Sequence, residues 1–393
     1  MKLSISLASQ LILVGVIISG NVAFAAGPNE IGKAKLAEAS LKEHSLEVFP
    51  QEVVFKYVND VQRIGVQIRM LDGTSRDVTR EIEWSRNGDV VLDGTKLTVS
   101  PKSAAGSSGT LEGTYAGQKV AVPYRLGDTN TQRYLSFRND ILPVLTKTGC
   151  NSGKCHGSAS GKDGFRLSLY GFDPEGDFFR ITREMSGRRV NLARPETCLM
   201  VNKATGEVPH TGGSLMEPGD PNYVKLVRWI AGGAEPDSDT TPLPVSINVF
   251  PDRAVLEKPG QKQDLIVMAK YDDGSLRDVT DMAVFLSNND AAASVTGGGN
   301  VFASGAGTAF VLARFDQFTS GTSIVVRSGE RYPGLKFEEN NYIDHFAAAR
   351  WRDLQVLPSP LSSDEVFLRR VFLDLTGRLP TPQQRAEFLE DSS

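Results

Sequence analysis

The sequence repeats itself over a long distance, and this repeat constrains the fold more than any other feature. The tripeptide Val-Phe-Pro at 48–50 recurs at 249–251, and Asp-Gly-Thr-Ser-Arg-Asp-Val-Thr at 72–79 recurs as Asp-Gly-Ser-Leu-Arg-Asp-Val-Thr at 273–280. Both matches lie at the same offset of 201 residues. An alternating stretch precedes Asp-Gly in each copy, as in half-buried strands closed by tight hairpins. Each copy is therefore predicted to be an all-β sandwich.

The N-terminus predicts export from the cytoplasm. Lys2 supplies a positive charge, residues 11–20 are apolar, and Ala23-Phe24-Ala25 fits a small-x-small cleavage site. We therefore expect a signal peptide at 1–25, with an uncleaved membrane anchor as the alternative. No later stretch approaches the roughly 18 apolar residues of a membrane-spanning helix. The predicted location is the periplasm or the cell surface, which allows association with the cell envelope.

Charge and cysteine content exclude two classes of protein. The net charge is -4 and no basic stripe is visible, which argues against nucleic acid as a partner. Only 3 cysteines and 4 histidines occur, so the chain is no disulfide scaffold. The scarcity of these residues makes any cluster of them informative.

Such a cluster lies at residues 150–156. Cys150, Cys155 and His156 form a C-x4-C-H motif, which is the C-x-x-C-H haem attachment signature with two extra residues between the cysteines. In a haem site the thiols hold the haem edge and the following histidine ligates the iron. A Cys150–Cys155 disulfide is an alternative in an exported protein. Zinc is a second alternative, although four clustered ligands are not available locally.

The neighbourhood of the motif resembles a known family. Residues 149–171, 187–193 and 229–234 are similar to the planctomycete cytochrome c domain, and 357–361 and 367–380 to the start of a planctomycete domain of unknown function. In that family such domains accompany bacterial Ig-like domains. The resemblance implies one covalent haem c, attached at Cys150 and Cys155 and ligated by His156.

The sixth ligand of that haem is not defined by the motif. A methionine usually supplies it in cytochrome c domains, but Val208 stands where that methionine would be. His210 is then the first candidate, because a neutral imidazole is a good iron ligand. Met216 and Met200 are the alternatives, and an open, five-coordinate iron is a third.

The resulting fold prediction is multidomain. It has two all-β Ig-like sandwiches flanking a mostly α cytochrome c-like haem domain, followed by a partial α-helical C-terminal module. The expected boundaries are 1–25 for the signal peptide, 26–127 for the first sandwich, 128–240 for the haem domain, 241–328 for the second sandwich, and 329–393 for the start of a truncated helical domain.

Three functions remain open at this point. The first is an exported c-type cytochrome that transfers electrons to an unidentified redox partner protein or a fused oxidoreductase, rather than a self-contained enzyme. The second is a cell-surface Ig-like binding or structural protein, with a disulfide instead of haem at 150–155. The third is haem catalysis or sensing through an open sixth position.

Overall fold

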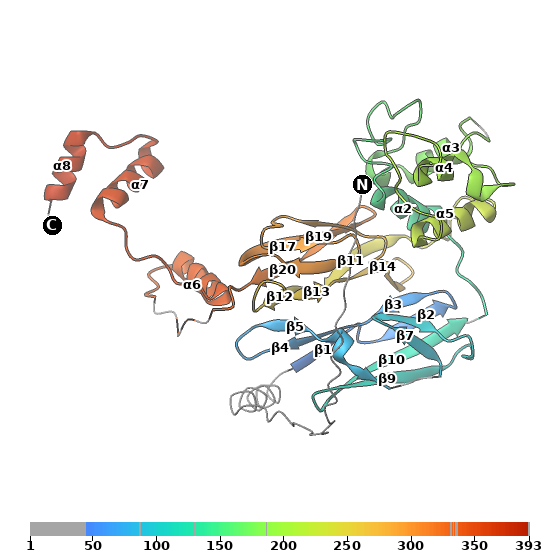
Figure 1. The fold of residues 1–393 in the computed structure, drawn as a ribbon, viewed down its shortest axis with the longest axis horizontal. Helices are drawn as coiled ribbons and strands as arrows, with labels where there is room; N and C mark the ends of the chain where they lie inside the picture. The colour runs from blue at the N-terminus through green and yellow to red at the C-terminus, as the bar shows by residue number, and fades with distance from the viewer. Residues whose placement is uncertain are drawn as a thin grey trace, which may run out of the picture. The chain divides into compact units, whose positions relative to one another are not determined.

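The sequence repeat forms two sandwiches with the same strand order. The computed structural model describes residues 45–85, 88–128, 130–185, 187–330, 332, 334 and 337–391. The predicted signal peptide at 1–25 lies outside them. Within the described ranges, strands β1–β20 make up the two copies of the repeat and short helices lie between and after them (Figure 1).

The first sandwich contains three sheets. Strand β2 pairs with β10 in parallel, whereas the other pairings are antiparallel. The sheet orders are β1-β4-β5, β2-β10-β9-β6 and β3-β8-β7. The strands are β1 (Ser45–Phe49), β2 (Val53–Tyr57), β3 (Val61–Arg63), β4 (Gly65–Arg69), β5 (Ser75–Asp77), β6 (Glu83–Trp84), β7 (Val90–Asp93), β8 (Lys96–Val99), β9 (Ser108–Tyr115) and β10 (Gln118–Asp128).

The second sandwich repeats this topology strand for strand. Its sheet orders are β11-β14-β15, β12-β20-β19-β16 and β13-β18-β17, and β12 again pairs with the last strand in parallel. The strands are β11 (Pro244–Phe250), β12 (Arg253–Leu256), β13 (Lys262–Asp264), β14 (Ile266–Tyr271), β15 (Leu276–Asp278), β16 (Val284–Ser287), β17 (Ala293–Val295), β18 (Asn300–Ala303), β19 (Gly307–Phe315) and β20 (Phe318–Val326).

Both faces of the strand at the centre of the repeat are buried. The alternating residues Val66 and Ile68 of β4 face the sandwich core, as the period-two pattern predicts. The intervening Gln67 is also buried, because the other sandwich covers that face. The prediction of half-buried strands is therefore wrong for β4, which lies between the core and a second domain.

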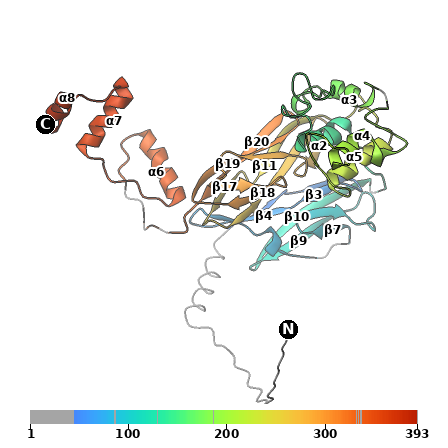
Figure 2. The same cartoon turned by 45° about the horizontal axis from the view of Figure 1, so that its top comes forward.

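The two sandwiches contact one another directly (Figure 2). Phe49 stacks on Phe250 with ring centroids 4.7 Å apart, and Phe49 packs against an apolar cluster of Phe250, Ile266 and Met268. Polar contacts surround this cluster, among them the ion pair between Arg63 and Asp278 at 3.2 Å. The mixture of apolar and charged contacts holds the two sandwiches together.

Residues 130–240 form a compact segment of short helices and long turns between the sandwiches. Its apolar core includes Phe137, Ile141, Leu145, Leu226 and Trp229. The helices are a π-helical turn η2 (Phe137–Ile141), α2 (Leu142–Lys147), the 3₁₀ turns η3 (Leu169–Gly171) and η4 (Pro195–Thr197), α3 (Pro174–Thr182), α4 (Leu199–Thr205) and α5 (Pro221–Ala231).

The predicted fold class is wrong for this segment and for the chain as a whole. Strand outweighs helix across the described ranges, and helical residues make up less than half of 130–240. Glycines with positive φ, such as Gly149 and Gly171, end or interrupt the helices. Residues 137–147 form one continuous helical stretch, whose first turn is π-helical and whose remainder is the six-residue α2. The segment is not a mostly α haem domain.

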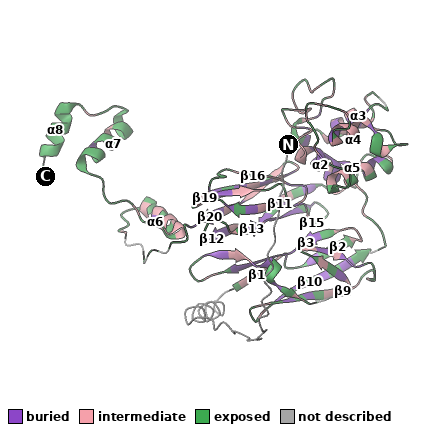
Figure 3. Ribbon diagram, viewed as in Figure 1, coloured by how far each residue is buried: buried purple, intermediate pink, exposed green. Residues whose placement is uncertain are grey.

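Three helices follow the second sandwich: α6 (Tyr342–Leu354), α7 (Asp364–Thr376) and α8 (Pro382–Glu390). Arg327 Nε donates a hydrogen bond of 2.7 Å to the carbonyl of Asp353, which ties α6 to the end of β20. A capping box at Thr381 begins α8, and Gly377 with its positive φ is the C-cap of α7. The N-cap of α7 is Ser363. Most residues of α7 and α8 are exposed (Figure 3).

None of the helices described here is long and apolar enough to cross a membrane.

Candidate functional site

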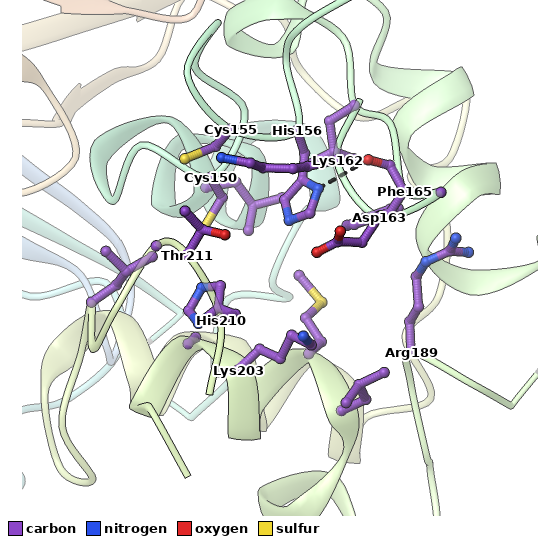
Figure 4. Close-up of a pocket in the computed structure, with 18 of the residues that line it drawn as sticks. Cys150, Cys155, His156, Lys162, Asp163, Phe165, Arg189, Lys203, His210 and Thr211 are labelled. Atoms are coloured by element: carbon purple, nitrogen blue, oxygen red, sulfur yellow. Dashed lines mark hydrogen bonds between the residues drawn. The ribbon is translucent and has the colours of Figure 1, made fainter. Parts of the chain in front are cut away.

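A pocket of about 310 Å³ lies in the 130–240 segment, and it contains every residue that the sequence singled out. Cys150, Cys155 and His156 line one side, and His210 lies across from them (Figure 4). The methionines weighed as alternatives, Met200 and Met216, also line the pocket. Side chains separated by up to 66 residues in the sequence therefore meet in one cavity, most of whose lining is apolar.

The turn after α2 places the motif at this cavity. Gly149 has a φ of 78°, which lets the chain reverse immediately after the helix. The amide of Cys150 donates to the carbonyl of Leu145, and the amide of His156 donates to the carbonyl of Cys150 at 2.9 Å. A side chain at Gly157 would lie 2.0 Å from the carbonyl oxygen of Asn151, so only glycine fits there. These contacts fold 150–157 into a tight loop.

Both cysteines of the loop are free thiols in the structure. The Sγ of Cys150 lies 3.3 Å from the hydroxyl oxygen of Thr148. Burial raises the pKa of the Cys150 thiol, and the nearby Cys155 adds to this effect. Cys150 is therefore a protonated, weakly nucleophilic thiol at neutral pH.

The His156 ring is fixed from two sides. Its Nδ1 lies 2.9 Å from the carbonyl oxygen of Phe165, so Nδ1–H donates and Nε2 is left as an acceptor. The centroids of the His156 and Phe165 rings lie 4.7 Å apart. The guanidinium carbon of Arg189 lies 4.3 Å from the centroid of the same Phe165 ring. The hydrogen bond and the tilted ring contact together hold the imidazole in one orientation at the pocket wall.

His210, unlike His156, has a buried ring nitrogen without a hydrogen-bond partner in the described part of the chain. This nitrogen is Nδ1. Burial lowers the pKa of His210, and the charges of Lys203 and His156 lower it further. The ring is therefore neutral at pH 7, with an unused nitrogen beside the cavity.

Charged residues around the cavity were not singled out from the sequence. Lys162, Lys203 and Arg188 line it together with Asp163, so the basic residues outnumber the acidic one. Arg189 is buried, and its Nη1 donates to the carbonyls of Arg180 and Glu184 at 2.8 and 2.7 Å. The run at 187–193 contains both arginines, but only the fold shows that they reach the pocket.

The comparisons with known proteins cover the chain unevenly. Residues 342–393 match the family described as "PSCyt2: Protein of unknown function (DUF1549)". No curated protein matches the chain. Among solved structures, domains 1-6 of the surface layer protein SbsC match at 10% identity and a TM-score of 0.20, covering 75% of this chain and 29% of that one. Its domains 5-6 match at 9% identity and a TM-score of 0.25, covering 72% and 97%. Scores this low carry no argument about fold or function.

These findings correct the cofactor and the function predicted from the motif. No group of three or more His, Cys, Asp or Glu side chains that could hold a metal ion occurs in the described part of the chain. The matched family lies at the C-terminal end and gives no support to a cytochrome c domain at 128–240. The predictions of haem c and of electron transfer are therefore wrong, and with them the iron-ligating role and the zinc alternative. What the comparisons establish is a C-terminal segment of the DUF1549 type.

Proposed function

We propose that this chain is an exported cell-surface structural or binding protein, in which the two Ig-like sandwiches support the pocket-bearing segment. The observation that carries the proposal is the way this segment is fixed to the second sandwich. A mobile tether between sandwiches would need no such attachment, whereas a binding module presented at a surface gains from a rigid support.

The centre of the attachment is Asp140, whose side chain is fully buried. Arg133 Nη1 lies 2.7 Å from one carboxylate oxygen, and Arg277 of the second sandwich pairs with the other. Burial alone would raise the pKa of Asp140, but the charges of Arg277 and Arg133 outweigh burial and hold that pKa below its ordinary value. A buried carboxylate with both oxygens paired fixes the position of both partners.

Three further contacts surround this ion pair. Lys147 Nζ, at the end of α2, donates to the carbonyls of Ala283 and Gly297 at 3.0 and 2.7 Å. Arg138 pairs with Asp316 at 3.3 Å, also on the second sandwich. The segment therefore meets the sandwich at several separate points, which is what resists rotation about a single contact.

The role proposed for Cys150 and Cys155 is a disulfide that closes the pocket loop after export. The loop brings both thiols to the same wall of the cavity, and cysteines of exported proteins meet an oxidising environment (Figure 4). The pocket itself is proposed as the binding site, with His156 and His210 as its main polar groups. An apolar cavity with a few fixed polar groups is the usual form of a small-molecule site.

Intact-mass measurement of the mature protein tests the thiol assignment. Material purified from an exporting bacterial host should lack two hydrogens relative to the reduced chain, and a peptide map should link Cys150 to Cys155. The disulfide would be overturned if both cysteines were alkylated without prior reduction, or if either one carried another covalently attached group. Cys198, which is buried and free, serves as the internal reference.

Sedimentation with a cell-envelope fraction tests the surface role. Wild-type protein and the Cys150→Ser variant should co-sediment equally, because the sandwiches rather than the loop are proposed to carry the association. Wild-type protein that stays in the supernatant would contradict the surface role, whatever the state of the two thiols.

A further inference from the structure

The contacts that the first sandwich makes with the second are related to those that the second makes with the first by an approximate two-fold axis. Residues 201 positions apart are equivalent in the repeat, and Phe49 stacks on its own equivalent, Phe250, with an interplanar angle of 5°. Strand β3 contacts β15, and the equivalent strand β13 contacts β5. The interface therefore has the geometry of a homodimer, although both halves belong to one chain.

Backbone contacts follow the same symmetry. The amide of Arg63 donates to the carboxylate of Asp278 at 2.7 Å. At the equivalent place, the amide of Asp264 donates to the carboxylate of Asp77 at 3.0 Å. These contacts would form equally well between two identical sandwiches, because both repeats keep the aspartate.

The charges at the interface break the symmetry. The first sandwich carries Arg63 and Arg80 where the second carries Asp264 and Asp281. Arg63 pairs with Asp281, and Arg80 pairs with Asp264 at 2.7 Å. Two first sandwiches would bring arginine to arginine at both places, and two second sandwiches would bring aspartate to aspartate. An arginine at position 63 would still face Asp77 in a pair of first sandwiches, as Arg63 faces Asp278 here, but only the unlike pair brings opposite charges together at both exchanged places.

The shape of the apolar centre breaks the symmetry in the same direction. Gly65 of the first sandwich is equivalent to Ile266 of the second. A Cβ at Gly65 would lie 3.1 Å from Ile266 Cδ1 and 3.2 Å from Phe250 Cε1, so the isoleucine fills the space that the glycine leaves. Two isoleucines would crowd this centre, and two glycines would leave a void there.

We infer that this surface is a pairing interface that joins a first sandwich to a second sandwich and not to another copy of itself. The discrimination comes from two positions that are arginine in one repeat and aspartate in the other, and from one position that is glycine in one repeat and isoleucine in the other. The partner of each sandwich is the other sandwich of the same chain, and two identical sandwiches from separate copies are rejected. Specificity of this kind needs a repulsive element against the wrong partner as well as an attractive one for the right partner. The inference does not depend on the proposed function.

Charge exchange in the full chain tests the first element. The double variant Arg63→Asp/Arg80→Asp places four acidic positions together and should lower the melting temperature by about 5 °C or more. Adding Asp264→Arg and Asp281→Arg should recover most of that loss. Recovery is expected to be incomplete because Lys96 also pairs with position 281. The control is Arg125→Asp, whose partner Glu52 lies in the same sandwich.

Exchange of the large side chain tests the second element independently. Gly65→Ile and Ile266→Gly should each lower the melting temperature, by crowding and by a void, and the combined variant should be more stable than either. For variants that remain folded, the rate of limited proteolysis at the chain between the sandwiches measures how often the interface between the two sandwiches opens. Strictly additive effects in both the charge set and the side-chain set would overturn the inference, as would dimers of the wild-type chain that join identical sandwiches.

Discussion

The two sandwiches have one topology and two different surroundings. Arg277 of the second sandwich is inserted into the pocket-bearing segment, where it pairs with the buried Asp140. The equivalent residue of the first sandwich, Arg76, is partly exposed and pairs with Glu81 and Tyr115 of its own sandwich. The shared fold therefore does not determine which sandwich binds the pocket-bearing segment. A few residues outside the core determine it.

The largest effect is expected where this comparison is sharpest. Arg277→Ala removes one of the two cations that face a fully buried carboxylate, and should lower the free energy of unfolding by about 3–5 kcal/mol. The matched change Arg76→Ala removes a partly exposed ion pair and should cost about 1 kcal/mol or less. Urea unfolding of both variants provides the measurement. Equal losses would show that the segment does not depend on the second sandwich.

A second contrast lies within the stacked aromatic pair. Phe250 is buried and belongs to the apolar cluster with Ile266 and Met268, whereas Phe49 is only partly buried. Phe250→Ala is expected to cost about 3 kcal/mol, and Phe49→Ala about 2 kcal/mol, by the usual cost of truncating a packed aromatic ring. Thermal unfolding of the two variants side by side gives the ranking, and the reverse order would contradict the packing described here.

The third contrast is a pH dependence at the face of the second sandwich that the pocket-bearing segment covers. Burial lowers the pKa of Lys147 to about 8, and the charges of Arg63 and Lys225 act in the same direction against Asp281. In the unfolded chain the lysine keeps its ordinary pKa of 10.5, so the unfolded state binds more protons between about pH 8 and 10.5. Stability should therefore rise with pH across this window.

Lys147→Met should flatten that rise. Part of it should remain, because the pKa of Lys225 is also lowered to about 8 by burial. Denaturation series at pH 8 and pH 10 on the wild type, the single variant and a Lys147→Met/Lys225→Met variant separate the two contributions. A wild-type chain whose stability is flat or falls over the window would exclude this explanation.

The smallest effect concerns the two equivalent aspartates of the interface. Asp278 accepts from both the amide and the guanidinium of Arg63, so Asp278→Asn should cost about 1–2 kcal/mol. Burial raises the pKa of Asp77, and Asp264 lies nearby, so a neutral amide is tolerated better there. Asp77→Asn is expected to cost less than about 1 kcal/mol. Chemical denaturation of the pair at pH 7 decides the order.

The sequence was informative where a pattern depends on local chemistry. The offset between repeats, the alternating strand around Val66 and the capping box at Thr381 all follow from propensity and spacing, and the structure contains them. Gln67 could not be interpreted in this way. A polar residue in an alternating strand predicts exposure, and only the neighbouring sandwich makes it buried.

The site shows the same division. Cys150, Cys155, His156 and His210 were chosen from the sequence and lie in one pocket, but the haem chemistry attached to them was wrong. The spacing of the cysteines identified them as a candidate site, but it could not distinguish haem attachment from a disulfide or a zinc ligand. Arg189 was missed as a pocket residue because its role depends on the ring of Phe165 and on two distant carbonyls.

The parallel pairing of β2 with β10, and of β12 with β20, has a mechanical consequence. In each sandwich an early strand lies alongside the last one and runs in the same direction. Tension between the two ends of a sandwich then acts along these strands, so their hydrogen bonds are loaded together in shear instead of opening one after another. Each sandwich is thereby suited to bear a pulling force without extending.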